Sequence, residues 1–165
     1  MARGLLTAWS YSRLQTYEAC PLKARLTYID KLGPPPSRAM VNGQEAHKQA
    51  ENFLKGGEYP YHPAWDSATW GALLTGLRER EYVPEQQVAF DKDWSVVEWY
   101  APDARCRMVF DASKLEKKVV HVIDYKTGRY SESHEEQAEM YAVGAALLFP
   151  TARVVREEFW YLDNG

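Results

Sequence analysis

The sequence predicts a single α/β domain, in which helices pack on a mixed β-sheet. Three observations support this: helix patterns fill the first 80 residues, four strand-like segments follow, and a long helix and a last strand complete the chain. The 165 residues are 45% hydrophobic and 26% charged, the composition of a globular domain that buries a core without disulfides. We expect residues 1–40 to form a basic, helical N-terminal segment and residues 41–165 to form the core of this one domain.

Two short helices are expected within residues 10–28. Ser10 and Ser12 are candidate N-caps for the first helix, and Pro21 suits the first turn of the second. The run 33–37, Gly-Pro-Pro-Pro-Ser, predicts a linker after them.

Two further helices are expected before residue 80. The first runs from about Gly43 to Leu54 and ends at Lys55-Gly56-Gly57, a typical C-terminal signal. Asp66 can cap the second helix, which carries apolar residues at the spacing of one helical face: Trp70, Leu73, Leu74 and Leu77.

The pattern changes from helix to strand after residue 85. Four strands are expected, at residues 86–90, 96–100, 107–112 and 119–125. We interpret them as an antiparallel meander in which the charged run 113–118 is the turn between the last two strands. A helix then runs from about Ser133 to Leu148, and a last strand spans 154–162.

Composition excludes several classes of protein. The longest apolar run, 143–149, is far shorter than the ~18 residues that a membrane helix needs. The two cysteines, Cys20 and Cys106, could pair only once, and the apolar stretch at the start is too short for a secretory signal. We therefore expect a cytoplasmic protein without membrane contact.

Charge is distributed unevenly along the chain. The net charge of −3 argues against a broadly basic surface for nucleic acid, but residues 1–40 carry +4 and the remainder carries −7. Two explanations remain open: chance asymmetry on a solvated surface, or a basic surface beside an acidic site that attracts cations.

Asp124 and Lys126, at the end of the expected strand 119–125, are the strongest candidates for a catalytic role. Side chains two residues apart in a strand share a face, so these two project together. A purely structural ion pair at the strand end is the alternative interpretation. Asp111 ends the preceding expected strand, and a hairpin would place it only moderately close to Asp124. If the two carboxylates converge, they require a divalent cation, whereas a solvated acid is the alternative for Asp111.

Two of the expected helices carry further polar candidates. His47 and Glu51 lie one turn apart on one face of the helix that begins near Gly43. Gln137 and Tyr141 share a face of the helix that begins near Ser133. Taken singly, a core or surface histidine and an ordinary amphipathic helix explain these residues as well.

The order of these residues is more specific than any one of them. Gly43-x-x-x-His47, then Asp111, then Asp124-x-Lys126-Thr127-Gly128, then Gln137-x-x-x-Tyr141 resembles the PD-(D/E)XK nuclease superfamily. More narrowly, it resembles the RecB-like exonuclease group, which includes nuclease domains of recombination helicase-nucleases and of CRISPR-associated proteins. The opening Ser10-x-Ser12-x-Leu14-x-x-Tyr17-x-x-Cys20-Pro21 is similar to the N-terminal helix of that group. The resemblance implies a restriction-endonuclease-like mixed sheet flanked by helices, with an N-terminal helical segment.

The resemblance also implies a role for each residue of the motifs. A divalent metal, Mg²⁺ or Mn²⁺, would be bound by His47, Asp111, Asp124 and the backbone carbonyl of Tyr125. With Asp111 and Asp124, Lys126 would be catalytic, because it would position the attacking water and stabilise charge in the transition state. Four residues would support the site, contact nucleic acid or reach a second metal: Gln137, Tyr141, Glu51 and Glu85.

The chain departs from the members of the group that bind an iron–sulfur cluster. Such a cluster needs four cysteines, and this sequence has two. Cys20 matches the first cluster position, but the C-terminal segment contains no cysteine. We therefore expect no iron–sulfur cluster, and we expect Cys20 to pack as a small apolar residue.

The resulting hypothesis is a metal-dependent DNA exonuclease in recombination, repair or phage DNA processing. It would act on single strands or duplex ends. Arg13, Lys23 and Arg25 would grip the phosphate backbone, and Trp9, Tyr11 or Tyr17 would stack on bases. The alternatives are a structure-specific or nicking endonuclease, and a non-catalytic subunit that binds nucleic acid or assembles with other proteins.

Overall fold

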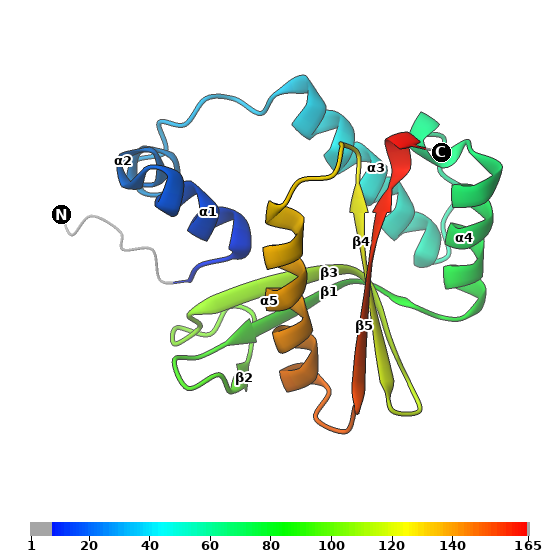
Figure 1. Cartoon of the computed structure of the whole chain (residues 1–165). Helices are drawn as coiled ribbons and strands as arrows, with labels where there is room; N and C mark the ends of the chain where they lie inside the picture. Colours follow the sequence, from blue (N-terminus) through cyan, green and yellow to red (C-terminus); the bar gives the residue numbers. More distant parts are fainter. Residues whose placement is uncertain (1–7, 165) are drawn as a thin grey trace. The chain divides into compact units, whose positions relative to one another are not determined.

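The fold, seen in a computed structural model that describes residues 8–164, is a five-stranded mixed sheet flanked by helices (Figure 1). The predicted fold class is therefore confirmed. The strand order is β2-β1-β3-β4-β5, with bounds β1 Val83–Phe90, β2 Val96–Val97, β3 Cys106–Glu116, β4 Val119–Lys126 and β5 Val154–Tyr161. The α-helices are α1 Tyr11–Ala19, α2 Pro21–Ala24, α3 Arg38–Leu54, α4 Ala68–Glu79 and α5 Ser133–Leu148. Within the described residues, no helix is long and apolar enough to cross a membrane.

The chain divides into two compact units. The first unit comprises residues up to 36 together with 87–108, and the second comprises 37–86 together with 109 onward. Strands β1 and β3 therefore contribute residues to both units. Every residue for which the sequence suggests a metal-binding or catalytic role belongs to the second unit.

Serine caps set the true starts of two helices in the second unit. α3 begins five residues before Gly43, because Oγ of Ser37 accepts a hydrogen bond from the Met40 amide. Ser37 thus caps a helix instead of ending a linker. Likewise, Ser67 caps α4 through the Trp70 amide, so the prediction of Asp66 as the cap was wrong. Both are cases in which a neighbouring serine with suitable backbone angles takes the capping position.

Strand β3 is longer than predicted, and the turn after it is shorter. Ser113 is only 1% exposed and pairs with Val122, so most of the expected turn 113–118 is part of the sheet. Only Lys117 and Lys118 make the turn, with Lys117 in the left-handed region at φ 56°. The ladder aligns Ala112 with Ile123, so that the residue preceding Ala112, Asp111, lies beside the end of β4.

The strands do not form the predicted meander. β3 neighbours β1 and not β2, and β5 runs parallel to β4 after the crossover through α5. β2 contains two residues, because the chain turns where the Ala101 amide bonds to the Glu98 carbonyl and the expected strand 96–100 stops.

In the second unit, helices cover both faces of β4 and β5. α5 packs along both strands (Figure 1), and the Tyr141 ring lies edge-on against Phe110 at 5.3 Å. On the other face, α3 and α4 enclose an aromatic core: Ala50, Phe53, Trp65, Leu74, Leu77, Tyr82, Ala112, Ile123, Tyr125, Trp160 and Leu162. Because side chains alternate along β4, Tyr125 joins this core whereas Asp124 and Lys126 face the other way, toward Gln137 of α5.

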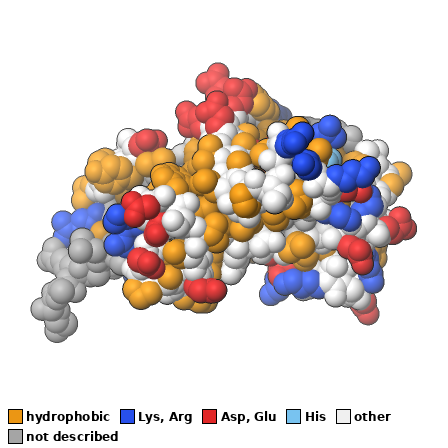
Figure 2. All heavy atoms as spheres, turned by 90° about the horizontal axis from the view of Figure 1, so that it is seen from below, with side chains coloured by type: hydrophobic (Ala, Val, Ile, Leu, Met, Phe, Trp, Pro, Cys, Tyr) orange, Lys and Arg blue, Asp and Glu red, His pale blue; other side chains and the backbone are white. Residues whose placement is uncertain are grey.

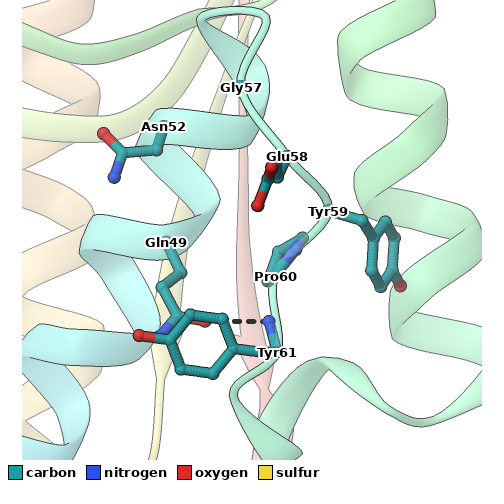
Figure 3. Close-up of a pocket in the computed structure, with 7 residues that line it drawn as sticks. All are labelled: Gln49, Asn52, Gly57, Glu58, Tyr59, Pro60 and Tyr61. Carbon is teal, nitrogen blue, oxygen red and sulfur yellow. Dashed lines mark hydrogen bonds between the residues drawn. The ribbon is translucent and has the colours of Figure 1, made fainter.

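Three hydrogen bonds, made by Gln49 and Trp65, hold α3 against the loop that follows it. The buried Gln49 accepts a hydrogen bond at Oε1 from the Tyr61 amide at 3.0 Å (Figure 3) and a second one from the His62 amide at 2.9 Å. The indole of Trp65, which is fully buried, donates to the Ala46 carbonyl at 3.0 Å. Ala46 precedes His47, so the hydrogen bond from Trp65 fixes the part of α3 that carries the imidazole.

In the first unit, Trp9 connects the N-terminal segment to residues 94 and 106. Its backbone forms a parallel bridge with Cys106, and its ring lies edge-on to Trp94 at 6.2 Å. Both cysteines are free: Cys106 is buried, whereas Cys20 is exposed. The apolar packing expected for Cys20 is therefore wrong, because its Sγ accepts from the Lys23 amide and caps α2. On the face drawn in Figure 2, acidic, basic and hydrophobic side chains are interspersed.

Candidate active site

An open cavity of about 680 Å³ in the second unit brings the predicted residues together. α3, β1, β3, β4 and α5 each contribute to its walls. Its lining includes every side chain predicted to bind metal, to catalyse or to support the site: His47, Glu51, Glu85, Asp111, Asp124, Lys126, Gln137 and Tyr141. Residues far apart in the sequence thus meet in one hollow.

Asp124, Lys126 and Gln137 form a closed triangle of polar contacts. Lys126 Nζ lies 2.6 Å from Asp124 Oδ2 and donates to Gln137 Oε1 at 2.9 Å. Gln137 Nε2 completes the triangle by donating to Asp124 Oδ1 at 3.0 Å. The side chain of Asp124 is 5% exposed and that of Lys126 is 19% exposed, so the ammonium group reaches the cavity while the carboxylate stays almost fully covered.

Asp111 links α3 to the end of β4. Its Oδ1 lies 3.2 Å from His47 Nδ1, and its Oδ2 accepts from the Tyr125 amide at 2.6 Å. The long β3 and its two-residue turn cause this approach, so Asp111 lies closer to Asp124 than a hairpin with a six-residue turn predicts. The Tyr125 ring packs edge-on against His47 at 5.6 Å and against Trp65 at 5.0 Å, which holds the imidazole in place.

Glu85 stands nearer to the centre of the site than the sequence suggests. Ligand atoms of His47, Glu85 and Asp111 all lie within 4.8 Å of one another, an arrangement that could hold a metal ion. Glu85 has φ 48°, a left-handed conformation that costs energy for a residue other than glycine within a strand. The sequence signal for this residue was only an acid placed directly before the expected strand 86–90.

The electrostatics of the site favour a cation. Burial raises the pKa of Glu85 to about 7, and the charges of Asp111 and Glu51 add to the effect. Burial and the neighbouring Asp111 also raise the pKa of Asp124, although Lys126 opposes the shift. Burial lowers the pKa of His47, but its hydrogen bond to Asp111 and the surrounding acids raise it by more. Carboxylates that are this crowded gain from a bound positive ion.

The donor set fits a divalent metal. Two carboxylates and one imidazole, with Asp124 adjacent, match the oxygen-rich coordination of Mg²⁺ or Mn²⁺. His47, Glu85 and Asp111 offer an imidazole and two carboxylates, whereas soft metals prefer thiolate ligands. Glu51 also lines the cavity but makes an ion pair with Lys55, one helical turn away.

The residues expected to bind DNA belong to the first unit. Arg13 and Arg25 line a separate, mainly apolar cavity of about 510 Å³, together with Trp9, Tyr17 and Arg105. Arg105 was not identified from the sequence because it lies far along the chain from the N-terminal helices.

The remaining expected DNA contacts differ in exposure. Lys23 is exposed on α2 and does not line this cavity. Tyr11 is 8% exposed, and its hydroxyl accepts a hydrogen bond from Gln15. Tyr17 is 58% exposed, so Tyr17 offers ring surface for stacking and Tyr11 offers little.

Comparison with known proteins gives one match. The family model of the PD-(D/E)XK nuclease superfamily matches residues 8–119 of the chain. The matched segment includes His47, Glu85 and Asp111, and it ends before Asp124 and Lys126. Neither the curated proteins nor the solved structures gave a match.

Proposed function

Because the chain belongs to the PD-(D/E)XK nuclease superfamily, whose members are metal-dependent nucleases, we propose that it is a DNA exonuclease of the RecB-like group. The observation that supports this is the meeting of His47, Glu85 and Asp111 with the triangle of Asp124, Lys126 and Gln137 in one cavity. We further propose that residues 1–165 act as one nuclease domain, in recombination, repair or phage DNA processing.

The proposed metal ligands are His47, Glu85 and Asp111, with Asp124 and the Tyr125 carbonyl completing the set on the β4 side. A Mg²⁺ or Mn²⁺ ion held there would neutralise the phosphate and lower the pKa of a coordinated water. Asp111 also has a structural role, because its Oδ2 accepts a hydrogen bond from the Tyr125 amide and so fixes the end of β4. His47 is oriented by its contacts with Asp111 and with the Tyr125 ring.

Lys126 is the proposed catalytic cation. Asp124 and Gln137 hold its ammonium group at the cavity wall. From there it would orient the attacking water and donate to a phosphate oxygen, whose negative charge grows in the transition state. Gln137 is a positioning residue in this scheme, since it contacts both Lys126 and Asp124.

Digestion of DNA labelled at the 5′ or the 3′ end, as linear and as closed circular substrates, tests the proposal. With Mn²⁺, linear DNA should be shortened from an end, closed circles should survive, and EDTA should stop the reaction. Lys126→Ala should be folded but at least about a hundredfold slower, whereas Lys118→Ala, at the exposed turn after β3, should match the wild type.

Each alternative gives a different outcome in the same assay. Cutting of closed circles would favour an endonuclease. Salt-dependent binding without metal-dependent turnover would favour a non-catalytic subunit. RNA of the same sequence tests the preference for DNA, and equal rates on both nucleic acids would overturn that part of the proposal.

A further inference from the structure

Four aromatic rings gather beside Lys126, at the ends of β4 and β5 and the start of α5. We call Tyr130, His134, Phe159 and Tyr161 the aromatic cluster. His134 stacks on Phe159 with ring centroids 5.7 Å apart, and its Nδ1 lies 2.8 Å from the Tyr161 hydroxyl. The Tyr130 ring lies 6.3 Å from His134 and 6.4 Å from Tyr161. Lys126 Nζ lies 5.1 Å from the centre of the Phe159 ring, so the cluster directly adjoins the proposed catalytic cation.

The cluster is not part of the buried core. Tyr130 is 57% exposed, and the other three rings are partly exposed. By contrast, the rings of Trp65 and Tyr125, which pack on the opposite face of the sheet, are almost completely covered. Exposed aromatic rings held together at the edge of a reaction site offer a surface on which a flat, apolar group can stack.

The charges around the cluster disfavour a phosphate near Tyr130 and favour one near Lys126. Glu132 and Glu135 stand at the start of α5, and Glu135 accepts a hydrogen bond from the Tyr130 hydroxyl. These acids repel a phosphate from the Tyr130 side, whereas Lys126 attracts one on the other side. Burial and the nearby Lys126 lower the pKa of His134, so its ring is neutral and suited to stacking near pH 7.

We propose that the aromatic cluster stacks on the nucleobase beside the phosphate that is cut, and that it therefore selects single-stranded or frayed DNA. The inference rests on the proposed function and names the form of the substrate. A base inside a duplex is already stacked on both sides, so only an unpaired base can turn onto the cluster. The phosphate of the same nucleotide then lies toward Lys126 and the metal ligands.

The test compares single-stranded oligonucleotides that carry either a base or an abasic residue at the cleaved position. With Mn²⁺, Tyr130→Ala should lower kcat/KM on the base-bearing strand by about five- to one-hundred-fold, the range for loss of one stacked base. It should leave the rate on the abasic strand unchanged. Tyr130→Phe should keep most of the activity, because the ring remains. Tyr61→Ala is the matched control, since Tyr61 is 80% exposed in the same unit and lines another pocket (Figure 3).

Two results would overturn the inference: an unchanged rate of Tyr130→Ala on the base-bearing strand, or an equal loss on both strands. If the wild-type protein cuts neither strand, the proposed function fails while the inference is still open to measurement. In that case, binding of the same oligonucleotides, measured by fluorescence anisotropy with Ca²⁺ in place of Mn²⁺, tests whether the cluster stacks on a base. Tyr130→Ala should weaken binding of the base-bearing strand alone, and equal weakening of both would refute base stacking.

Discussion

Replacing Glu157 by glutamine should stabilise the protein at alkaline pH. Glu157 pairs with Val122 across β4 and β5, so it points toward α5, on the same face as Asp124. Among the described residues, neither of its carboxylate oxygens has a hydrogen-bond partner. Burial raises its pKa to about 8, Asp124 adds to this, and Lys126 opposes it. The folded protein therefore holds this proton where the unfolded chain has lost it.

The sign and size of the effect follow from this raised pKa. The ordinary pKa is 4.5, so the cost is absent below about pH 4.5 and grows as the pH rises toward 8, where the folded protein also loses the proton. A tenfold difference in acidity between the folded and the unfolded state corresponds to about 1.4 kcal/mol, and the whole interval would give an upper limit of about 5 kcal/mol. Both carboxylate oxygens are buried, but the residue as a whole is only half-buried, so screening reduces this to about 1–3 kcal/mol.

Urea unfolding followed by circular dichroism at about pH 5 and about pH 8.5 measures the effect. Relative to the wild type, Glu157→Gln should gain about 1–3 kcal/mol more in the free energy of unfolding at the higher pH than at the lower. Glu139→Gln, on the exposed side of α5, is the control and should show no such difference. The reasoning is refuted if the two variants respond to pH in the same way.

Three further predictions concern the site. Lys126→Ala should lower kcat by about 10²- to 10³-fold while the affinity for Mn²⁺, measured by calorimetry, stays within a few-fold of the wild type. Glu85→Gln should weaken Mn²⁺ binding by about 10- to 100-fold in the same titration, and an unchanged affinity would remove Glu85 from the ligand set. A Cβ at Gly43 would lie 2.7 Å from Thr127 Oγ1, so Gly43→Ala should destabilise the protein by about 1–3 kcal/mol in urea unfolding. Adding Thr127→Ala should recover that loss, because it removes the clashing oxygen.

The sequence predicted best where a periodic pattern and a motif agree. Helix α5 was expected from Ser133 to Leu148 and has those bounds. The apolar run before Asp124 made β4 recognisable, and the side chains that the motifs identified as candidate metal ligands and catalytic groups line one cavity. Patterns of this kind are local, so one sequence contains them in full.

The features that depend on partners elsewhere in the fold could not be predicted in this way. Residues 113–118 look like a turn because they are mostly charged, yet Ser113 is buried against its neighbours in the sheet. Because the turn was predicted to be too long, the close approach of Asp111 to the end of β4 was not predicted. The role of Glu85 was underestimated because its position depends on a left-handed backbone conformation, which the periodicity of the sequence does not predict. The aromatic cluster draws its rings from three separate segments, which only the parallel pairing of β4 and β5 brings together.

The same residues that stabilise the second unit also arrange its chemistry. Trp65 bonds to the carbonyl that precedes His47, and the Tyr125 ring contacts both Trp65 and the imidazole. On the backbone of Tyr125, the amide holds Asp111, while the side chains before and after it, Asp124 and Lys126, face the cavity. One residue of β4 thus connects the aromatic core on one face of the sheet with the acids and the amine on the other. Because the proposed metal ligands come from α3, β1 and β3, their spacing depends on how this core packs, and a change in the core should weaken Mn²⁺ binding before it unfolds the protein.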